Sequence, residues 1–361
     1  MLIVAGLSLK NLEPRVWDPL SEFHIPALKA VMVSYAEFHQ MQARRTAAMK
    51  VGLRQYLGVP KHIDVYLDNG AFYFSGQEKG ESPHDEYEEF ADTTKPTWKP
   101  IPQDYIPLPS MSPQKQRGCF DKTMRVNHAY EHDGYVPVVH IGNHLEDYTD
   151  ELTASPKLSA KSSIALGAIV PNLLRKPKAI PYTEVLSGLL HVRTVFEEKT
   201  LHVFGVGGTA TLHLMALLGI DSADSSGWRN RAARGIIQLP GSGERLVASL
   251  GNWRGRRPSW KEWQGLHRCQ CPACRNYGVE GLKAKKLHGF CCRATHNLWV
   301  LLEENRWLEE HVGAGTYVGN YEERVDNSVY RPLIDELLIQ LGFRETTPAV
   351  SLTPRRRKAR R

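Results

Sequence analysis

The chain has 361 residues and a formal net charge of +7, and its 42% hydrophobic and 24% charged residues are ordinary for a globular protein. No apolar run approaches the roughly 18 residues of a membrane-spanning helix. The N-terminal stretch "MLIVAGLSLKN" lacks the basic start and the cleavage site of a secretory signal. The sequence therefore predicts a cytoplasmic protein, not a membrane protein, with one large barrel-type domain and an appendage or with two domains.

Eight β-rich runs follow one another through the first two-thirds of the chain, and helical patterns separate many of them. Several runs are almost continuously apolar, as is typical of strands buried on both faces. Eight strands alternating with helices predict an α/β fold of the (β/α)8 TIM-barrel type. In chain order the runs are LIVAGLS from Leu2, AVMVSY from Ala30, DVYLDNG from Asp64, DYIPLPS from Asp104, VPVVHIG from Val136, IALGAIV from Ile164, LHVFGVG from Leu201 and DSADSS from Asp221.

The third run leads into the stretch VYLDNGAFYF, which has two interpretations. Taken alone, Asp68, Asn69 and Gly70 between β-prone runs predict a tight hairpin, in which Asp68 is a turn residue. A hairpin would break the alternation of strands and helices, however. As the end of the third barrel strand, Asp68 lies on the face where barrel enzymes build their active sites.

Residues 77–103 are acidic and Pro-rich and show neither a helical nor a strand period. They predict a long solvated loop between the third and fourth strands, with a lid or a partner contact as the alternative. Basic residues are concentrated later in the chain: residues 228–293 carry fourteen Lys or Arg against three Glu, and six more lie between Arg355 and Arg361. This distribution favours a polyanion partner, nucleic acid, over a merely solvated surface.

Three of the six cysteines crowd into the motif CQCPAC as Cys269, Cys271 and Cys274. Thiolates at this spacing can converge on one tetrahedral zinc ion, which needs a fourth ligand. His288, the Cys291–Cys292 pair and His296 are the candidates. His296 is favoured because it opens an apolar helix that would hold its ring rigidly. Four protein ligands leave no open position, so the predicted Zn2+ is structural.

These patterns predict a single domain over residues 1–345. It contains the zinc-binding segment at about 262–300 and amphipathic C-terminal helices at about 296–343. Residues 346–361 are predicted to be a basic, disordered tail.

The motif C-x-C-x-x-C, followed about twenty residues later by a histidine before Asn, resembles the zinc site of the tRNA-guanine transglycosylase superfamily. The stretch DNGAF resembles the family motif around its first catalytic Asp. The stretches HVFGVGG and GIDSADSSGWRNR resemble its glycine-bearing strand and the segment with its second catalytic Asp. The resemblance covers roughly residues 60–300 and implies the same barrel.

The resemblance also implies a chemistry. Exchanging a nucleobase with retention at the sugar carbon requires two displacements, as in retaining glycosidases. Asp224 matches the nucleophile that forms the covalent sugar intermediate, and Asp68 matches the acid/base that protonates the departing guanine. Asp221 is the local alternative to Asp224 as the nucleophile. The resemblance places Asp221 at the start of the strand, facing the preceding helix.

Further residues are expected around the exchanged base, which must leave the helical stack to be reached. Phe72 would stack on the base and Asp104 would accept its amidine hydrogen bonds, with a strand cap as the alternative role of Asp104. His140 falls where the family has a glutamine that reads the base, and a buried core histidine is its alternative. The remaining expectations are backbone contacts from Gly167 and Ala168, a tight turn near the sugar at Gly205 and Gly207, and phosphate or neighbouring-base contacts from Arg229, Arg231 and Arg234.

Two departures from the family's tRNA enzymes, Asn69-Gly70-Ala71 after the first Asp and His140 in the fifth strand, make the chain more similar to the deazapurine-in-DNA transglycosylases. We therefore expect replacement of guanine by a 7-deazaguanine such as preQ0 in DNA rather than in tRNA. The same chemistry on tRNA is the first alternative. A non-catalytic, zinc-containing nucleic-acid-binding subunit and a carbohydrate glycosidase are the others. A homodimer and accessory DNA-modification proteins are the further partners considered.

Overall fold

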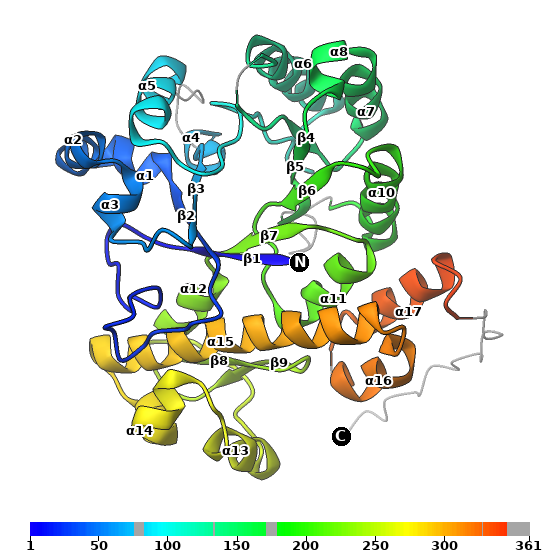
Figure 1. The fold of residues 1–361 in the computed structure, drawn as a ribbon. Helices are drawn as coiled ribbons and strands as arrows, with labels where there is room; N and C mark the ends of the chain where they lie inside the picture. Colours follow the sequence, from blue (N-terminus) through cyan, green and yellow to red (C-terminus); the bar gives the residue numbers. More distant parts are fainter. Residues whose placement is uncertain (76–82, 133, 171–178, 327, 345–361) are drawn as a thin grey trace, which may run out of the picture.

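Seven parallel strands form one curved sheet in the computed structural model, which describes residues 1–75, 83–132, 134–170, 179–326 and 328–344 (Figure 1). The strand order is β3-β2-β1-β7-β6-β5-β4, so strands that are neighbours in the sheet are consecutive in the chain except for β1 and β7, and β3 and β4 lie at the two edges. The strands are β1 (Leu2–Gly6), β2 (Ala30–Ser34), β3 (Asp64–Asp68), β4 (Val138–His140), β5 (Ser163–Gly167), β6 (Thr200–Val203) and β7 (Ser222–Ser225). Seven of the eight predicted strands are thereby confirmed.

The predicted strand at Asp104 is wrong, because residues 102–108 form no regular structure. Its place between β3 and β4 is taken by residues 97–101. Single parallel bridges join Trp98 to Tyr66 of β3 and Pro100 to Val136 before β4. Backbone hydrogen bonds from Leu67 to Trp98 (3.0 Å) and from Ile101 to Val136 (3.0 Å) support them. The sheet is therefore a ring of seven strands and one bridged segment rather than eight full strands.

Helices surround the sheet on its outer side (Figure 1). The predicted long loop at 77–103 is wrong in part, because α5 occupies residues 84–94 and buries Tyr87, Phe90 and Ala91. The helices between the strands are α1 (Tyr35–Gln40), α2 (Gln42–Val51), α3 (Leu53–Leu57), α4 (Ala71–Ser75), α5 (His84–Thr94), α6 (Pro113–Ala129), α7 (Leu145–Ala154), α8 (Pro156–Ser159), α10 (Tyr182–Val195) and α11 (Thr209–Leu217). No helix in the described part of the chain is long and apolar enough to cross a membrane.

The chain after β7 forms a second layer that is fastened to the barrel by one long helix, α15 (Lys286–Gly313), which crosses beneath β1 and β7 in Figure 1. Asn297 of α15 donates to the carbonyls of Trp228 and Ile236 and accepts from the backbone of Gln238 at 2.7 Å. The other elements of this layer are α12 (Gly227–Ala233), the antiparallel hairpin of β8 (Ile236–Leu239) and β9 (Gly243–Leu246), α13 (Trp260–His267), α14 (Pro272–Lys283), α16 (Tyr317–Arg324) and α17 (Arg331–Gln340).

The boundary of the predicted single domain at residue 345 stays a prediction, and the predicted tail at 346–361 lies outside the described residues. At the other end, the N-terminal amine pairs with Glu309 of α15 at 2.6 Å. Both β1 and the long helix are thus tied together at the start of the chain.

Candidate active site

A cavity of about 260 Å³ opens where the parallel strands end. This is the position at which barrel folds build catalytic sites, because the loops after the strands converge there. Its wall brings together side chains and backbone from the ends of six strands, β1, β2, β3, β5, β6 and β7, and from the loop at 102–108. Of the predicted site residues, the structure places Asp68, Phe72, Asp104, Gly167, Ala168, Gly205 and Asp224 on this wall.

Asp68 ends β3 in a strand-to-helix turn, so the hairpin interpretation is wrong. Gly70 has a φ of +80°, and α4 begins directly afterwards at Ala71. A side chain at residue 70 would also place its Cβ 2.6 Å from the Cβ of Ala36, so only glycine fits this turn. The backbone N–H of Gly70 donates to Asp68 Oδ2 at 3.1 Å, which fixes the carboxyl group towards the cavity.

The pKa of Asp68 is raised to about 7. Burial of the carboxyl group is the largest cause, and the negative charges of Asp224 and Asp104 add to it. Hydrogen bonds from Ser34 and Gly70 work in the opposite direction. A carboxyl group with this pKa is half protonated near neutral pH, so it can both give and take a proton there.

Asp224 lies in β7 and is 15% exposed, so its carboxylate is within reach of a ligand in the cavity. The backbone N–H of Gly205, in the turn after β6, donates to Asp224 Oδ1 at 2.7 Å. Asp221 is turned away from the cavity: it pairs with Arg193 of α10 at 3.2 Å and accepts from the backbone of Leu201. The geometry leaves Asp224 as the carboxylate of this segment that faces the cavity.

Asp104 is held rigidly at the cavity wall by two partners. Its Oδ1 accepts from Asn69 Nδ2 at 2.8 Å, and its Oδ2 lies 2.8 Å from His140 Nε2. The other ring nitrogen of His140 lies 3.0 Å from the hydroxyl of Tyr148. Each carboxylate oxygen still has a lone-pair site for a ligand N–H, because an ionised carboxyl accepts at about four sites.

His140 is 1% exposed and does not line the cavity. It lies behind Asp104, and a Cβ on Gly167 would come within 2.7 Å of its ring. A direct contact between His140 and the base stays a prediction, and in this structure the ring orients Asp104, in agreement with the alternative of a buried histidine. Asn69 also orients Asp104. In the sequence, Asn69 is a turn residue by one interpretation and part of a departure from the family motif, and nothing there indicates this contact.

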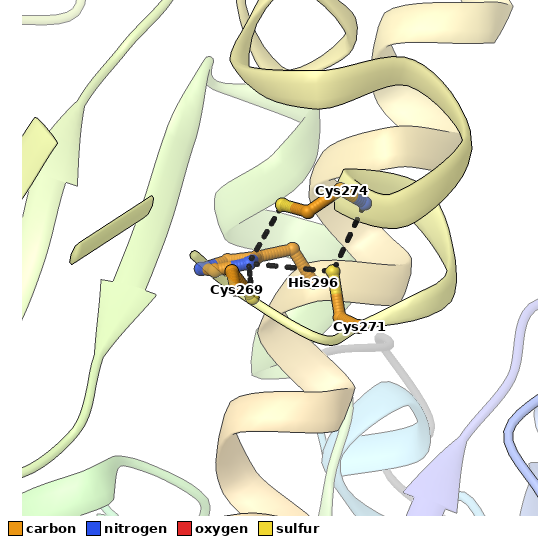
Figure 2. A group of neighbouring side chains, drawn as sticks. All are labelled: Cys269, Cys271, Cys274 and His296. Carbon is orange, nitrogen blue, oxygen red and sulfur yellow. Dashed lines mark hydrogen bonds between the residues drawn. The ribbon is translucent and has the colours of Figure 1, made fainter. Parts of the chain in front are cut away.

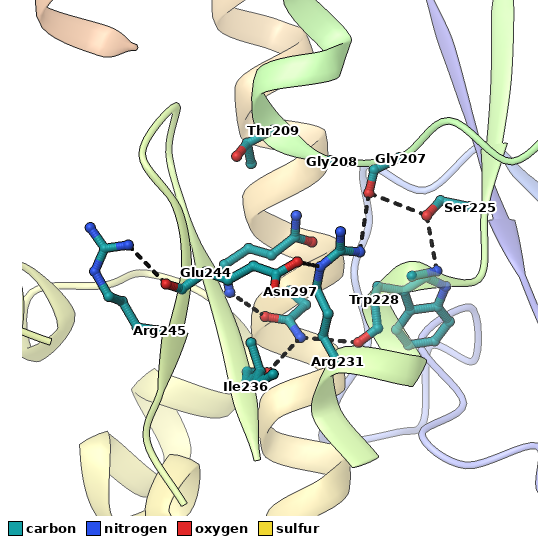
Figure 3. Close-up of polar contacts among 12 residues, drawn as sticks. Gly207, Gly208, Thr209, Ser225, Trp228, Arg231, Ile236, Glu244, Arg245 and Asn297 are labelled. Atoms are coloured by element: carbon teal, nitrogen blue, oxygen red, sulfur yellow. Dashed lines mark hydrogen bonds and ion pairs between the residues drawn. The ribbon is translucent and has the colours of Figure 1, made fainter. Parts of the chain in front are cut away.

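A second, larger groove of about 810 Å³ adjoins the cavity and shares Phe72 and Gly205 with it. Phe72 is 60% exposed and lines both the cavity and the groove. Gly207, Arg231 and Arg234 line the groove rather than the cavity. Arg231 reaches the carbonyl of Gly207 and pairs with Glu244 at 2.5 Å (Figure 3).

Arg229 is an exception among the predicted site residues, because it lines neither the cavity nor the groove. Its side chain is buried, and its guanidinium donates to the backbone carbonyls of Asn11 and Glu13. Burial lowers the pKa of Arg229 to about 10. The predicted phosphate contact is thus wrong for Arg229, which fixes the loop after β1, whereas Arg231 and Arg234 stay in position for it.

The predicted metal ligands converge on one point between α14 and α15 (Figure 2). The Sγ atoms of Cys269, Cys271 and Cys274 each lie 3.6 Å from His296 Nδ1. Zn–S bonds of about 2.3 Å and a Zn–N bond of about 2.0–2.1 Å in a tetrahedron require an S···N edge of about 3.5–3.6 Å. The four residues therefore fit zinc in both donor type and spacing.

Second contacts hold these ligands in place. His296 Nε2 lies 3.1 Å from the carbonyl of Gln238 in β8, which leaves Nδ1 for the metal. Cys271 caps α14, and its Sγ accepts from the backbone of Cys274 at 3.2 Å. His296 lies well inside α15 rather than at its start, and the rejected candidates Cys292 and His288 contact each other at 3.6 Å.

Residues 162–329 match the family model described as queuine tRNA-ribosyltransferase. The matched part contains Asp224 and all four cysteine and histidine ligands, and such a cluster is typical of the zinc site of this family. Asp68, Phe72 and Asp104 lie before it. No curated protein matches the chain.

We predict one zinc ion per chain, bound by a site that also holds the second layer together. Cys271→Ser and His296→Ala should lose the ion and melt at a lower temperature, because metal binding at a structural site contributes directly to folding. Cys292→Ser is the matched control, since Cys292 is a buried thiol of the same segment outside the cluster. Native mass spectrometry with metal analysis provides the measurement. Full zinc content in His296→Ala would reassign the fourth ligand.

The raised pKa of Asp68 has a consequence for stability. The unfolded chain loses the Asp68 proton near pH 4, whereas the folded chain keeps it to about pH 7. The wild type should therefore lose stability between these values relative to Asp68→Asn, by up to about 4 kcal/mol, and the difference should stay constant at higher pH.

Denaturant unfolding of both proteins from pH 4 to 9 measures this difference in the free energy of unfolding. Groups that titrate alike in the two proteins contribute equally to both values and cancel in the difference. Asp150→Asn, which changes an exposed carboxylate on α7, is the control. A flat difference between wild type and Asp68→Asn across this range would contradict the raised pKa.

Proposed function

We propose that this chain, a transglycosylase with a queuine tRNA-ribosyltransferase family domain at residues 162–329, replaces guanine in DNA with a 7-deazaguanine such as preQ0. The family description implies base exchange on a nucleic acid. What carries the proposal to these residues is one observation: Asp68 and Asp224 face the same cavity from the ends of β3 and β7. The charge of Asp224 is close enough to contribute to the raised pKa of Asp68.

The proposed reaction is a double displacement at the sugar carbon C1′. Asp224 Oδ2 attacks C1′ while the bond from C1′ to guanine N9 breaks, and the electron pair stays on the guanine. Asp68, whose pKa of about 7 keeps about half of it protonated at neutral pH, gives its proton to the departing base. The incoming base then gives a proton back to Asp68, its N9 bonds to C1′, and the C1′–Oδ2 bond breaks with its electrons returning to Asp224.

Base recognition is proposed for the wall opposite the nucleophile. Phe72 would stack on the flipped base, an interaction worth about 1–3 kcal/mol per base. Asp104 would accept N–H groups from the amidine edge, with Asn69 and His140 keeping its oxygens in place. The backbone at Gly167 and Ala168 would approach the base closely, and Gly205 would lie near the sugar.

The adjoining groove supports a polynucleotide substrate. It continues from the cavity past Phe72 to Arg231 and Arg234. The guanidinium of Arg234 lies 4.3 Å from the ring of Trp253, which is 51% exposed. Arg234 is exposed as well, and an exposed arginine next to an exposed aromatic ring is a combination that binds the backbone and bases of single strands.

The preference for DNA rests on the lining of the cavity. Leu7, Met32 and Phe204 form the apolar part of the wall on the side of β1, β2 and β6. A ribose 2′-hydroxyl buried against apolar side chains would lose its hydrogen bonds to water at a cost in free energy. Because the family description names tRNA, the same reaction on tRNA is the second candidate.

Mass spectrometry of nucleosides decides between the two substrates. DNA and tRNA should be prepared from cells that express the wild type or Asp224→Asn. A 7-deazaguanine deoxynucleoside that appears in DNA only with the wild type is the expected result. The modified nucleoside in tRNA alone would establish the second candidate, and its absence from both would overturn base exchange.

Substitutions of Asp68 and Asp224 should impair the reaction in different ways. Asp68→Asn should fold and lose about 10²–10⁴-fold in exchange rate, because Asn cannot transfer the proton. Asp224→Asn should form no covalent adduct with an oligonucleotide on a denaturing gel. Asp221→Asn, three residues away and outside the cavity, should stay within a few-fold of the wild type. A fully active Asp68→Asn protein would remove Asp68 from the mechanism.

A further inference from the structure

A buried histidine lies directly behind the carboxylate of Asp224. His202, in β6, is 2% exposed, and its Nε2 lies 3.5 Å from Asp224 Oδ1. Within the described residues, this nitrogen has no other polar partner and forms no hydrogen bond of normal length. A buried polar atom without a partner is costly, so its direction towards the carboxylate needs an explanation.

The ring of His202 is fixed on its other sides. Its Nδ1 lies 2.9 Å from the hydroxyl of Ser222 in β7, the strand that also carries Asp224. The rings of Trp98, Phe204 and Tyr66 surround the imidazole with centroids 4.7, 5.1 and 5.7 Å away. The imidazole therefore has little freedom to rotate, and Nε2 can only face Asp224.

The tautomer follows from this geometry. If Nδ1 carried the proton, the lone pair of Nε2 would face the negative carboxylate, which is unfavourable. With the proton on Nε2, Ser222 donates to Nδ1 and His202 directs an N–H at Asp224 Oδ1. The same Oδ1 already accepts from the backbone of Gly205 at 2.7 Å. Two N–H donors on one oxygen leave Oδ2 as the atom that is free to attack.

We propose that His202 is a positioning residue that selects Oδ2 of Asp224 as the nucleophile and stabilises the carboxylate when it leaves the sugar. This inference rests on the proposed function of Asp224. In the covalent intermediate Oδ1 is the carbonyl oxygen of an ester, which accepts hydrogen bonds less strongly than a carboxylate does. The donors on Oδ1 therefore favour the free carboxylate over the adduct and assist the second displacement, in which the C1′–Oδ2 bond breaks.

Two substitutions separate this role from simple packing. His202→Gln places an amide N–H near the position of Nε2 and so keeps a donor towards Asp224. His202→Asn keeps a polar group near Nδ1 and Ser222 but is too short to reach Asp224. Both variants remove the imidazole from the aromatic pocket, so loss of packing affects them alike.

We expect His202→Gln to keep kcat within a few-fold of the wild type. His202→Asn should lower kcat about 10–100-fold with little change in KM for the oligonucleotide. The loss is smaller than the ~10²–10³-fold cost of removing an aligned oxyanion donor, because the Gly205 amide remains. At the same time, the fraction of His202→Asn protein trapped as covalent adduct should rise above that of the wild type, since its carboxylate is the poorer leaving group.

The outcomes are distinguishable. Equal kcat values for the Gln and Asn variants, or an adduct fraction that falls together with turnover in His202→Asn, would overturn the role of His202 while leaving base exchange intact. A wild type that forms neither product nor adduct with DNA or tRNA would overturn the proposed function, and the role of His202 with it. Thermal melting of both variants shows that each is folded during the assay.

Discussion

Three carboxyl groups line one small cavity, and the rest of the site depends on how hydrogen bonds offset their mutual repulsion. Contacts with Asn69 and His140 offset the negative charge of Asp104, and a hydrogen bond from the N–H of Gly205 offsets that of Asp224. Asp68 has only the weaker support of Ser34 and Gly70, so burial and its two acidic neighbours raise its pKa. Residues of one chemical type thereby acquire different surroundings, and such differences allow two carboxylates to act as acid and nucleophile in one site, as proposed for Asp68 and Asp224.

The barrel provides the strand ends that form the cavity, but only single bridges hold the segment at its eighth position. The second layer supports the barrel on the side of β1. α15 connects the metal site, β8 and the start of the chain: His296 contacts Gln238, and Asn305 donates to the carbonyl of Met1 at 2.8 Å. The preceding residue of the same helix, buried Glu304, pairs with His213 of α11 at 2.8 Å. Since residues of α11 and β7 line the groove, α15 links the metal site to the groove in which we propose that the polynucleotide binds.

Most of the barrel could be predicted from the sequence, because parallel strands buried on both faces are continuous apolar runs. The fourth strand could not. The run DYIPLPS looks apolar, but its two prolines cannot donate to a ladder, and the segment that replaces it contains Pro100 and forms only bridges. The helix α5 was missed because its acidic residues obscured an apolar face made by Tyr87, Phe90 and Ala91.

The site was predictable where residue type alone restricts the chemistry, as for the zinc ligands and for carboxylates at strand ends. It was not predictable where a role depends on what lies behind a side chain. Arg229 belongs to a basic stretch, yet its carbonyl partners are more than two hundred residues away in sequence. His202 sits in an apolar strand and gave no signal, because its partner Ser222 lies in a different strand.

The family model matches only part of the candidate site. Asp224, His202 and the zinc ligands lie within residues 162–329, whereas Asp68, Asn69, Phe72, Asp104 and His140 lie before them. Under the proposed function, the matched part contains the groups that act on the sugar, and the preceding part contains those that face the base. A glutamine at position 140 could also form a hydrogen bond with Asp104. His140 contacts the Tyr148 hydroxyl through its other ring nitrogen, so it holds Asp104 Oδ2 from one fixed direction. Under the proposed function, the Asn69–Asp104–His140 arrangement sets the identity of the incoming base, in the part of the chain that the family model does not match.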